Sequence, residues 1–505
     1  MTVVAQEEKS LQQVAVEKLE LPARDLTTEL YDLGGVHESF TLDRYNATIE
    51  YYFSKNNTPK LLTGIVGSSI LSELAFPQGP VIKGALDAIM YLLKLNWLVG
   101  IPYSAQFNLG INSFSKDQFY INPENIISRR DEIEGKNIIY TLTTRGKNTD
   151  TVKDSTKSVL YWLKKVKEKY ALNFGAEPWV VTEEDSYTER KGRFKGLENL
   201  GAKIFVVPED YETTNRTKFK ARALNYITEE RGDLGLNTKN DWIYHQDDET
   251  TVGEDTVLGN LDFILSKNGI LGTGTILYDL DWKNTILFTK ELLRTPDEYR
   301  VLMSNKLKGI CLGQHGSHFI SRADLEDSIG WDFGEIRAED WLFGTKVLDL
   351  YPSSIKIMKG FAHEKAPLSV QDSLRQRRRW LLGNYEIIKR DDVKMKHKLP
   401  ALYSLAGWYS AAPSLLATVL TPFLSTGGIF PGSGFLAGIY WFSALNSLKV
   451  GYQMNKDYLP VKLEKLSDKA KFIGNFIGGI ILDSITPWYA LIRPTKSYDN
   501  IKKDS

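Results

Sequence analysis

Trp242-Ile-Tyr-His-Gln-Asp-Asp-Glu-Thr250 is the most informative stretch of the sequence, because an apolar segment runs directly into three acidic residues. The segment Trp242 to His245 predicts a β-strand. Three acids at the carboxyl end of a strand repel one another and are costly unless a cation lies there. In sheets of parallel strands, active sites lie beyond the carboxyl ends of the strands. The stretch therefore predicts a strand and, directly after it, a candidate site.

Between about Lys136 and Arg390, short β-rich segments alternate with longer helical ones. Alternation of this kind over such a length predicts an α/β layer fold with a mainly parallel sheet. The predicted strands are residues 137–143, 179–182, 204–207 and 242–245, and the predicted helices are residues 151–167, 219–230 and 257–268.

The acidic residues after the strand suit a divalent cation. Mg²⁺ and Mn²⁺ prefer carboxylate oxygens and commonly take one or two of them together with substrate phosphates. Alternate residues of an extended turn point to one side, so we expect Asp247 and Glu249 to share the ion while Asp248 faces away. For this stretch taken alone, the alternative is a solvated acidic turn.

A second acidic pair, Glu339-Asp340, opens a predicted helix and is followed by Trp341. A carboxylate held partly out of water by an aromatic neighbour has a raised pKa. Such a group suits a general base that takes a proton from a hydroxyl nucleophile. The alternative is a pair of helix N-terminal acids that the helix dipole stabilises.

The segment Gln376-Arg-Arg-Arg-Trp380 combines three arginines with a tryptophan. Arginines form bidentate hydrogen bonds to a diphosphate, and a tryptophan offers a flat face to a sugar ring. The alternative is a basic cluster beside a membrane that binds anionic lipid.

The C-terminal part contains 50 consecutive residues, Leu399 to Leu448, without an Asp, Glu, Lys or Arg. We expect a hairpin of two membrane-spanning helices, Ala401 to Leu424 and Phe435 to Leu448 with its preceding residues, because each is about long enough to cross roughly 30 Å of hydrocarbon. Basic residues on both sides of the hairpin predict cytoplasmic flanks and a cytoplasmic catalytic domain. Residues 472–492 span, re-enter or lie at the interface, and residues 81–99 span or lie at the interface.

Length and composition limit the classes of function. A chain of 505 residues predicts two or three parts, which we place at 1–135 (an N-terminal region with a membrane or interfacial helix), 136–395 (the catalytic domain) and 396–505 (transmembrane or interfacial helices). The chain has 63 basic and 63 acidic residues, so its net charge gives no case for a nucleic-acid partner. Cys311 is the single cysteine, which excludes an intrachain disulfide and a cysteine-cluster metal site. The N-terminus lacks the pattern of a signal peptide.

The three motifs stand in an order that resembles the processive-type family 2 glycosyltransferases, which include cellulose, chitin and hyaluronan synthases. That order is an acidic turn, then Glu-Asp, then Q-x-x-R-W immediately before apolar helices. Finer features resemble the egghead-type β-mannosyltransferase branch. These are Thr143-Thr-Arg-Gly146, the stretch Trp242 to Thr250, Ala338-Glu-Asp340 and Gln376 to Trp380.

The resemblance implies a GT-A fold and assigns roles to particular residues. Asp340 is implied to be the general base, and Asp247 and Glu249 to hold Mg²⁺ or Mn²⁺. The residues implied to contact the nucleotide sugar are Thr144, Arg145, Glu184, Asp185, Lys218, Asp247 and Arg379, with Glu183 and Lys220 as neighbours in the same segments. Glu339, Gln376 and Trp380 are implied to lie on the acceptor side.

The expected activity is that of a membrane-bound inverting glycosyltransferase, which moves a hexose from GDP-mannose or UDP-glucose to a hydroxyl of a glycan or glycolipid acceptor. A general base without a protein nucleophile gives one displacement and a β-linkage. Expected partners are the nucleotide-sugar donor, the acceptor and membrane lipid, with a multi-pass topology and a cytoplasmic catalytic domain. The alternatives are a processive polysaccharide synthase that exports its polymer, a non-catalytic membrane scaffold and a transporter.

Overall fold

The computed structural model describes residues 37–55, 63–64, 66–67, 85–266, 269–279, 285–307, 309–424, 433–458 and 465–493. The predictions for the first 36 residues, for residues 81–84 and for the turn at 425–432 lie outside the described residues. The resemblance-based assignments all fall within them.

An eight-stranded sheet in the order β3-β2-β1-β4-β7-β6-β8-β5 forms the centre of the molecule. Its first four strands are parallel, with Asn137 of β1 paired to Gly175 of β2 and to Asp241 of β4. This register brings the carboxyl ends of β1, β2 and β4 to one edge of the sheet. The strands are β1 (Asn137–Thr144), β2 (Gly175–Glu183), β3 (Lys203–Val207) and β4 (Asp241–Gln246).

The second half of the sheet is mixed, while parallel pairs still outnumber antiparallel ones over the whole sheet, as the sequence predicts. β7 is antiparallel to both β4 and β6, β6 is parallel to β8, and β5 is antiparallel to β8. The alternation of strands and helices in the sequence is clear only up to the predicted helix at residues 257–268. It therefore does not predict the remaining strands of the sheet. They are β5 (Thr251–Val252), β6 (Leu271–Asp279), β7 (Phe319–Arg322) and β8 (Ile355–Lys365).

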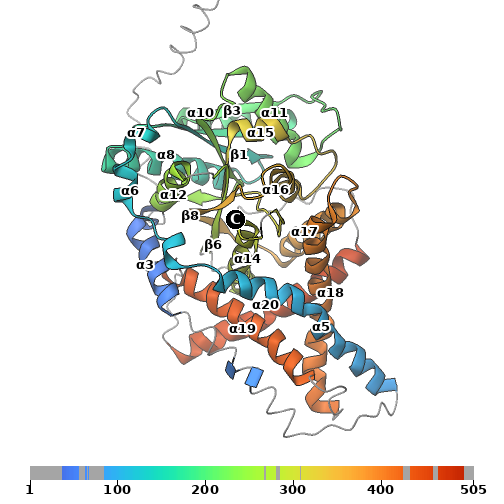
Figure 1. The fold of residues 1–505 in the computed structure, drawn as a ribbon. Helices are drawn as coiled ribbons and strands as arrows, with labels where there is room; N and C mark the ends of the chain where they lie inside the picture. The colour runs from blue at the N-terminus through green and yellow to red at the C-terminus, as the bar shows by residue number, and fades with distance from the viewer. Residues whose placement is uncertain are drawn as a thin grey trace, which may run out of the picture.

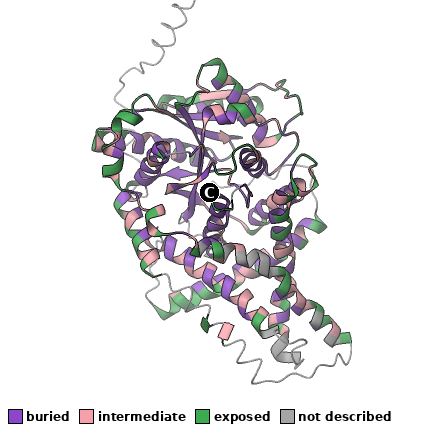
Figure 2. Ribbon diagram, in the orientation of Figure 1, coloured by how far each residue is buried: buried purple, intermediate pink, exposed green. Residues whose placement is uncertain are grey.

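Helices cover the sheet and complete a GT-A-like mixed α/β fold, as expected (Figure 1). The central strands β1 and β4 are almost fully buried (Figure 2). Trp179 and Tyr244 have no exposed surface. Burial of such large apolar side chains between layers is the main stabilising contribution. The helices around the sheet are α8 (Thr149–Tyr170), α9 (Glu184–Glu189), α10 (Lys191–Leu200), α11 (Phe219–Asp233), α12 (Glu254–Leu265), α13 (Thr285–Leu292), α14 (Thr295–Leu302), α15 (Ala323–Ile329) and α16 (Glu339–Leu350).

The N-terminal region joins the C-terminal helices. α5 (Ala85–Asn112) packs against α18 (Met395–Leu424) and α19 (Ser433–Asn455), below the sheet in the view of Figure 1. α20 (Leu466–Ile492) packs against α13, α18 and α17 (Val370–Lys389). The remaining short elements are η1 (His37–Ser39), α3 (Leu42–Ser54), η2 (Lys116–Gln118), α6 (Pro123–Ile127), α7 (Arg130–Ile133), η3 (Met303–Asn305) and η4 (Lys456–Tyr458).

Helices occupy the positions at which the sequence predicts membrane segments. Of the described helices, α20 alone has both the length and the apolar composition to cross a membrane, which by itself is a weak indication. Its outer face carries exposed Ile473, Ile477, Ile481 and Ile485 at helical spacing. The helical part of the hairpin prediction is thus confirmed, and its crossing of a membrane stays a prediction.

Candidate active site

A cavity of about 770 Å³ opens beyond the carboxyl ends of β1 and β4 and continues between α17, α18, α19 and α20. Residues from all three predicted motifs line it. The parallel register brings Thr144 and the acidic turn together, and α16 and α17 add the other two motifs. The predicted site residues in its wall are Thr144, Arg145, Lys218, Asp247, Glu249, Glu339, Asp340, Gln376, Arg379 and Trp380.

The acidic turn differs from the extended geometry expected for it. The backbone N–H of Thr250 donates to the carbonyl of Asp247 at 3.0 Å, which closes a turn. Side chains therefore do not alternate, and Asp248 lines the cavity together with Asp247 and Glu249. The carboxylate of Asp248 accepts hydrogen bonds from Thr144 Oγ1 at 3.3 Å and Asn148 Nδ2 at 3.2 Å. The expectation that Asp248 faces away is therefore wrong.

Burial and the neighbouring carboxylates raise the pKa of Asp248 well above its usual range. Loss of water around the group is the largest cause, followed by Glu249 and then Asp247. A cation at the turn would relieve this repulsion. The donor set, carboxylate oxygens alone, is the chemistry that Mg²⁺ and Mn²⁺ prefer.

Lys220 is a cationic partner of the turn. Its ammonium donates to Asp247 Oδ1 and, at 2.6 Å, to the carbonyl of Gly316. Among the described residues, no three acidic, histidine or cysteine side chains are grouped so that they could hold an ion alone. The carboxylates of Asp247 and Glu249, which both line the cavity, fit a divalent cation of the kind that commonly takes one or two carboxylates together with donor phosphates.

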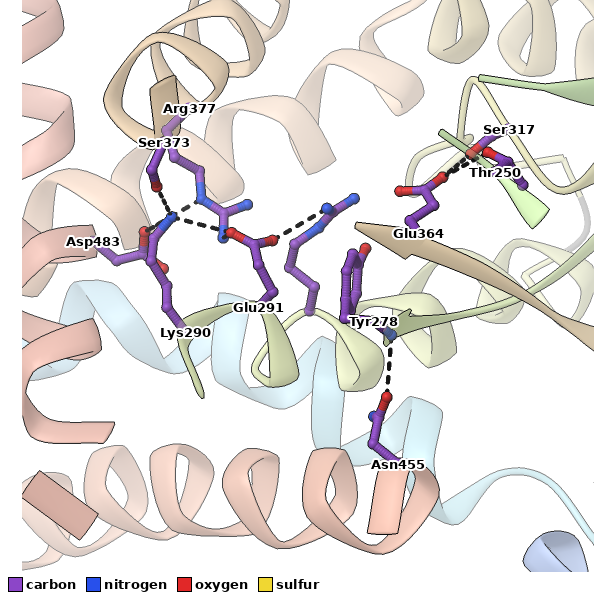
Figure 3. Close-up of polar contacts among 11 residues, drawn as sticks. Thr250, Tyr278, Lys290, Glu291, Ser317, Glu364, Ser373, Arg377, Asn455 and Asp483 are labelled. Atoms are coloured by element: carbon purple, nitrogen blue, oxygen red, sulfur yellow. Dashed lines mark hydrogen bonds and ion pairs between the residues drawn. The ribbon is translucent and has the colours of Figure 1, made fainter. Parts of the chain in front are cut away.

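Glu364 is a further acidic residue of the cavity, which the sequence reasoning missed. It comes from β8, is 4% exposed, and accepts hydrogen bonds from Ser317 Oγ and, at 3.4 Å, Thr250 Oγ1 (Figure 3). Burial, together with Glu249, raises its pKa to about 7. Its segment, Ala362-His-Glu-Lys365, carries no recognisable motif, so the pairing of β8 with β6 and β5 was needed to find it.

The two acids of the second motif begin α16. The backbone N–H of Trp341 donates to Asp340 Oδ1 at 2.7 Å, while the Oε2 atom of Glu339 is buried without a hydrogen-bond partner in the described structure. Burial raises the pKa of Asp340, and the amide of Trp341 and Lys220 oppose the rise. Burial and the charge of Asp340 raise the pKa of Glu339 to about 8. Burial and the neighbouring carboxylate therefore favour the protonated form of Glu339, whereas the amide of Trp341 and Lys220 favour the charged form of Asp340.

Asp340 and the acidic turn face each other across Gly316. A Cβ atom added to Gly316 would lie 3.2 Å from both Asp340 Oδ2 and Lys220 Nζ, and 3.9 Å from Asp247 Oδ1. The first and second motifs, distant in sequence, therefore meet within one small space. A reacting atom near Gly316 can contact the carboxylate of Asp340, which can accept a proton, and the ammonium of Lys220, which can bind a phosphate.

The third motif lies on α17, with Gln376, Arg377, Arg379 and Trp380 in the cavity wall. Gln376 is 4% exposed, and its Oε1 atom has no hydrogen-bond partner within the described residues. The guanidinium carbons of Arg294 and Arg377 each lie 4.4 Å from the centre of a Trp380 ring. Cationic groups thus hold the indole of Trp380 at the cavity wall.

Three residues predicted to contact the nucleotide sugar, Glu184, Asp185 and Lys218, form ordinary contacts within the protein or lie outside the cavity wall. Glu184 and Asp185 are not in the cavity wall, and the Glu184 carboxylate accepts the backbone N–H of Glu209 at 2.9 Å. Their neighbour Glu183 lines the cavity and pairs with Arg222. Lys218 lines the cavity edge and pairs with exposed Glu335 at 2.7 Å.

Comparison with family models and curated proteins identifies relatives. Residues 242–453 match the model of glycosyl transferase family group 2. The chain is 27% identical over 327 residues to β-1,4-mannosyltransferase egh of Drosophila melanogaster, covering 63% of this chain and 66% of that protein. It is 31% identical over 222 residues to β-1,4-mannosyltransferase bre-3 of Caenorhabditis elegans, covering 43% and 48%. The matches thus span about half to two thirds of these relatives.

Among solved structures, the chain is similar to the mannosyltransferase PcManGT from Pyrobaculum calidifontis, solved in complex with GDP-Man and Mn²⁺. The identity is 11%, the TM-score is 0.44, and the match covers 80% of this chain and 99% of the other.

Proposed function

Because residues 242–453 match the model of glycosyl transferase family group 2, we propose that the chain is an inverting hexosyltransferase that glycosylates a membrane glycolipid. The observation that carries the proposal is the meeting of Asp340, Lys220 and Asp247 around Gly316. Mannose is the proposed sugar because both relatives described above are named β-1,4-mannosyltransferases. GDP-mannose is accordingly the first donor to test, and UDP-glucose the second.

Asp340 is the proposed general base. Its carboxylate takes the proton of an acceptor hydroxyl, whose oxygen attacks the anomeric carbon while the bond to the nucleoside diphosphate breaks. A raised pKa makes a carboxylate a better proton acceptor than a solvated one. One displacement inverts the configuration, so an α-linked donor gives a β-linkage. Glu339, whose protonated form burial favours, can donate a hydrogen bond to the acceptor beside Asp340.

Negative charge develops on the leaving diphosphate and needs compensation. Lys220 and Arg379 line the cavity that contains Asp340 and supply fixed positive charge. A divalent cation, Mg²⁺ or Mn²⁺, would be held by Asp247 and Glu249, with Asp248 in the same turn. When bound, such an ion neutralises the phosphates of the donor and of the leaving group.

Buried polar atoms support a sugar acceptor next to Asp340. Gln314, Glu339, Gln376, Asn384 and Ser404 each have a buried side-chain atom without a hydrogen-bond partner among the described residues, and all five line the cavity. Buried polar groups without partners are costly and are normally satisfied by a ligand or water. The hydroxyl groups of a sugar can donate to and accept from such groups.

The slot between the long helices suits the lipid part of the acceptor. Small residues leave room there, and aromatic rings offer apolar surface. The slot is continuous with the part of the cavity that contains Asp340, so one acceptor can occupy both. Membrane attachment through α20 and the hairpin helices would bring a glycolipid to this slot. Its lining includes Gly407, Trp408, Ala411, Tyr440, Trp441, Ala444 and Pro487.

Transfer by the purified full-length chain tests this function. The chain in detergent receives labelled GDP-mannose or UDP-glucose, Mn²⁺ or EDTA, and octyl β-D-glucoside as the acceptor probe. We expect metal-dependent addition of one hexose in β-linkage. Long products would favour the polysaccharide synthase instead, and no transfer from either donor to the probe or to a total membrane-lipid extract would contradict the proposal.

A further inference from the structure

α20 approaches α13 closely at Gly479. A Cβ atom added to Gly479 would lie 3.1 Å from the Cβ and 3.3 Å from the Cα of Lys290. Asp483 follows one helical turn later and therefore lies on the same face of α20. The opposite face carries the exposed isoleucines, so the helix presents one apolar side outward and one acidic group inward.

Asp483 enters a network of buried charges (Figure 3). Its Oδ1 atom lies 3.0 Å from Lys290 Nζ and accepts a hydrogen bond from Arg377 Nε at 3.2 Å. Lys290 also donates to Ser373 Oγ of α17 at 2.6 Å. Glu291 accepts from Arg377 Nη2 at 3.4 Å. The network therefore connects α13, α17 and α20 through groups that are mostly shielded from water.

The network contains three cations and two acids. Its cations are Lys290, Arg377 and Arg294, and its acids are Glu291 and Asp483. Arg294 donates a hydrogen bond to Glu291 at 3.2 Å. Lys290 and Glu291 have no exposed surface. Neutralising Asp483 would remove the carboxylate that contacts both Lys290 and Arg377. Like charges in a poorly hydrated place repel strongly, so the guanidinium groups would have to move apart.

The guanidinium groups of Arg294 and Arg377 also contact Trp380. We infer that Asp483 is a positioning residue for glycosyl transfer, which holds Arg377 and, through it, the indole of Trp380 at the acceptor side of the cavity. Arg377 and Trp380 lie three residues apart on one helix, so a shift of the first moves the surface against which the second packs. The inference rests on the proposed function. It joins the candidate membrane helix α20 directly to the chemistry.

The test compares Asp483→Asn with Asp483→Glu in the full-length chain. Asp468→Asn is the matched control, because Asp468 lies in the first turn of the same helix and outside the cavity wall. Transfer to octyl β-D-glucoside, hydrolysis of labelled GDP-mannose by water and the melting temperature are measured for each variant. We expect Asp483→Asn to raise the acceptor KM and to lower the ratio of transfer to hydrolysis by roughly 10- to 100-fold. Asp483→Glu should restore part of the ratio.

A double variant separates positioning from general damage. If Asp483 acts through Arg377, Asp483→Asn combined with Arg377→Gln should lower the ratio no further than the worse single variant. A wild-type acceptor KM and ratio in Asp483→Asn would overturn the inference. Equal losses of transfer and hydrolysis with a lower melting temperature would also overturn it. Asp340→Asn distinguishes the two proposals, because wild-type transfer by that variant would refute the proposed function itself.

Discussion

Glu339 and Asp340 are adjacent in the sequence, yet their surroundings give them different protonation states. The amide of Trp341 and the ammonium of Lys220 stabilise charge on Asp340, whereas Glu339 is buried beside that charge with an unpaired oxygen. Because their pKa values differ, Asp340 can act as the general base while Glu339 acts as a hydrogen-bond donor.

The pH dependence of transfer tests this division. Glu339 loses its proton as the pH rises past about 8, and the new charge attracts Lys220 and Arg379 away from the donor phosphates. We therefore expect the rate of transfer to decline above about pH 8 in the wild type. Glu339→Gln resembles the protonated form, so it should keep most of the activity at pH 7 and lack the decline. A decline of equal size in Glu339→Gln would assign that titration to another group.

At the scale of elements, α17 must lie close to the start of α16. A Cβ atom added to Gly383 of α17 would lie 2.9 Å from the Cβ of Ala338. Ala338 directly precedes the two acids of the second motif. The packing of these two helices therefore sets the distance between the base and the arginines.

Gly383→Ala should disturb this packing. Crowding of a packed contact typically costs about 1–3 kcal/mol, so the melting temperature and the transfer rate should both fall. Gly196→Ala in α10 is the control, since nothing lies within 4 Å of its added Cβ and alanine favours helix. Its melting temperature should be unchanged or slightly higher. Identical behaviour of the two variants would show that the contact does not matter.

Two arginines of α17 separate a catalytic role from a lipid-binding role. Arg379 lines the cavity, whereas Arg375 pairs with Asp372 at 3.3 Å outside it. An ammonium cannot reproduce the planar fork of a guanidinium on a diphosphate, so Arg379→Lys should lose most of the transfer and Arg375→Lys little. If both variants transferred at the wild-type rate, a basic patch that needs only charge would explain the segment.

At the scale of the whole molecule, a polar α/β domain is joined to a layer of long helices with apolar outer faces. Exposed leucines, isoleucines and a tryptophan occur on α5, α18 and α20, including Leu92, Leu402 and Trp488. Large apolar surfaces of this kind mark contact with a membrane or a partner. The cavity extends from the domain into this layer.

We expect the full-length chain to remain in the membrane pellet after extraction at high salt and at alkaline pH. Apolar helices hold a protein against such treatment, whereas a purely electrostatic attachment does not. Release by salt alone would limit the attachment to the basic clusters, and release without any treatment would exclude the membrane model.

Much of this arrangement could be predicted from the sequence, because local patterns report local structure. The strands β1 to β4 and the helices α8 and α11 follow from alternation, and the parallel register then brings Thr144 and Asp247 to one edge. Contacts between distant segments could not be predicted. Lys220 reaches Asp247 from the first turn of α11, and Glu364 and Asp483 enter the cavity from segments without a motif. The turn at Asp248 also escaped prediction, because its hydrogen bond replaces the alternation of a strand.

The most direct test of the central claim is hexose transfer from GDP-mannose to octyl β-D-glucoside by Asp340→Asn, with donor binding measured in parallel by calorimetry. Asparagine keeps the shape of the side chain and removes its ability to accept a proton. The account predicts that turnover falls by about 10²- to 10⁴-fold while donor affinity in the presence of Mn²⁺ stays close to that of the wild type. Wild-type turnover by Asp340→Asn would contradict the account.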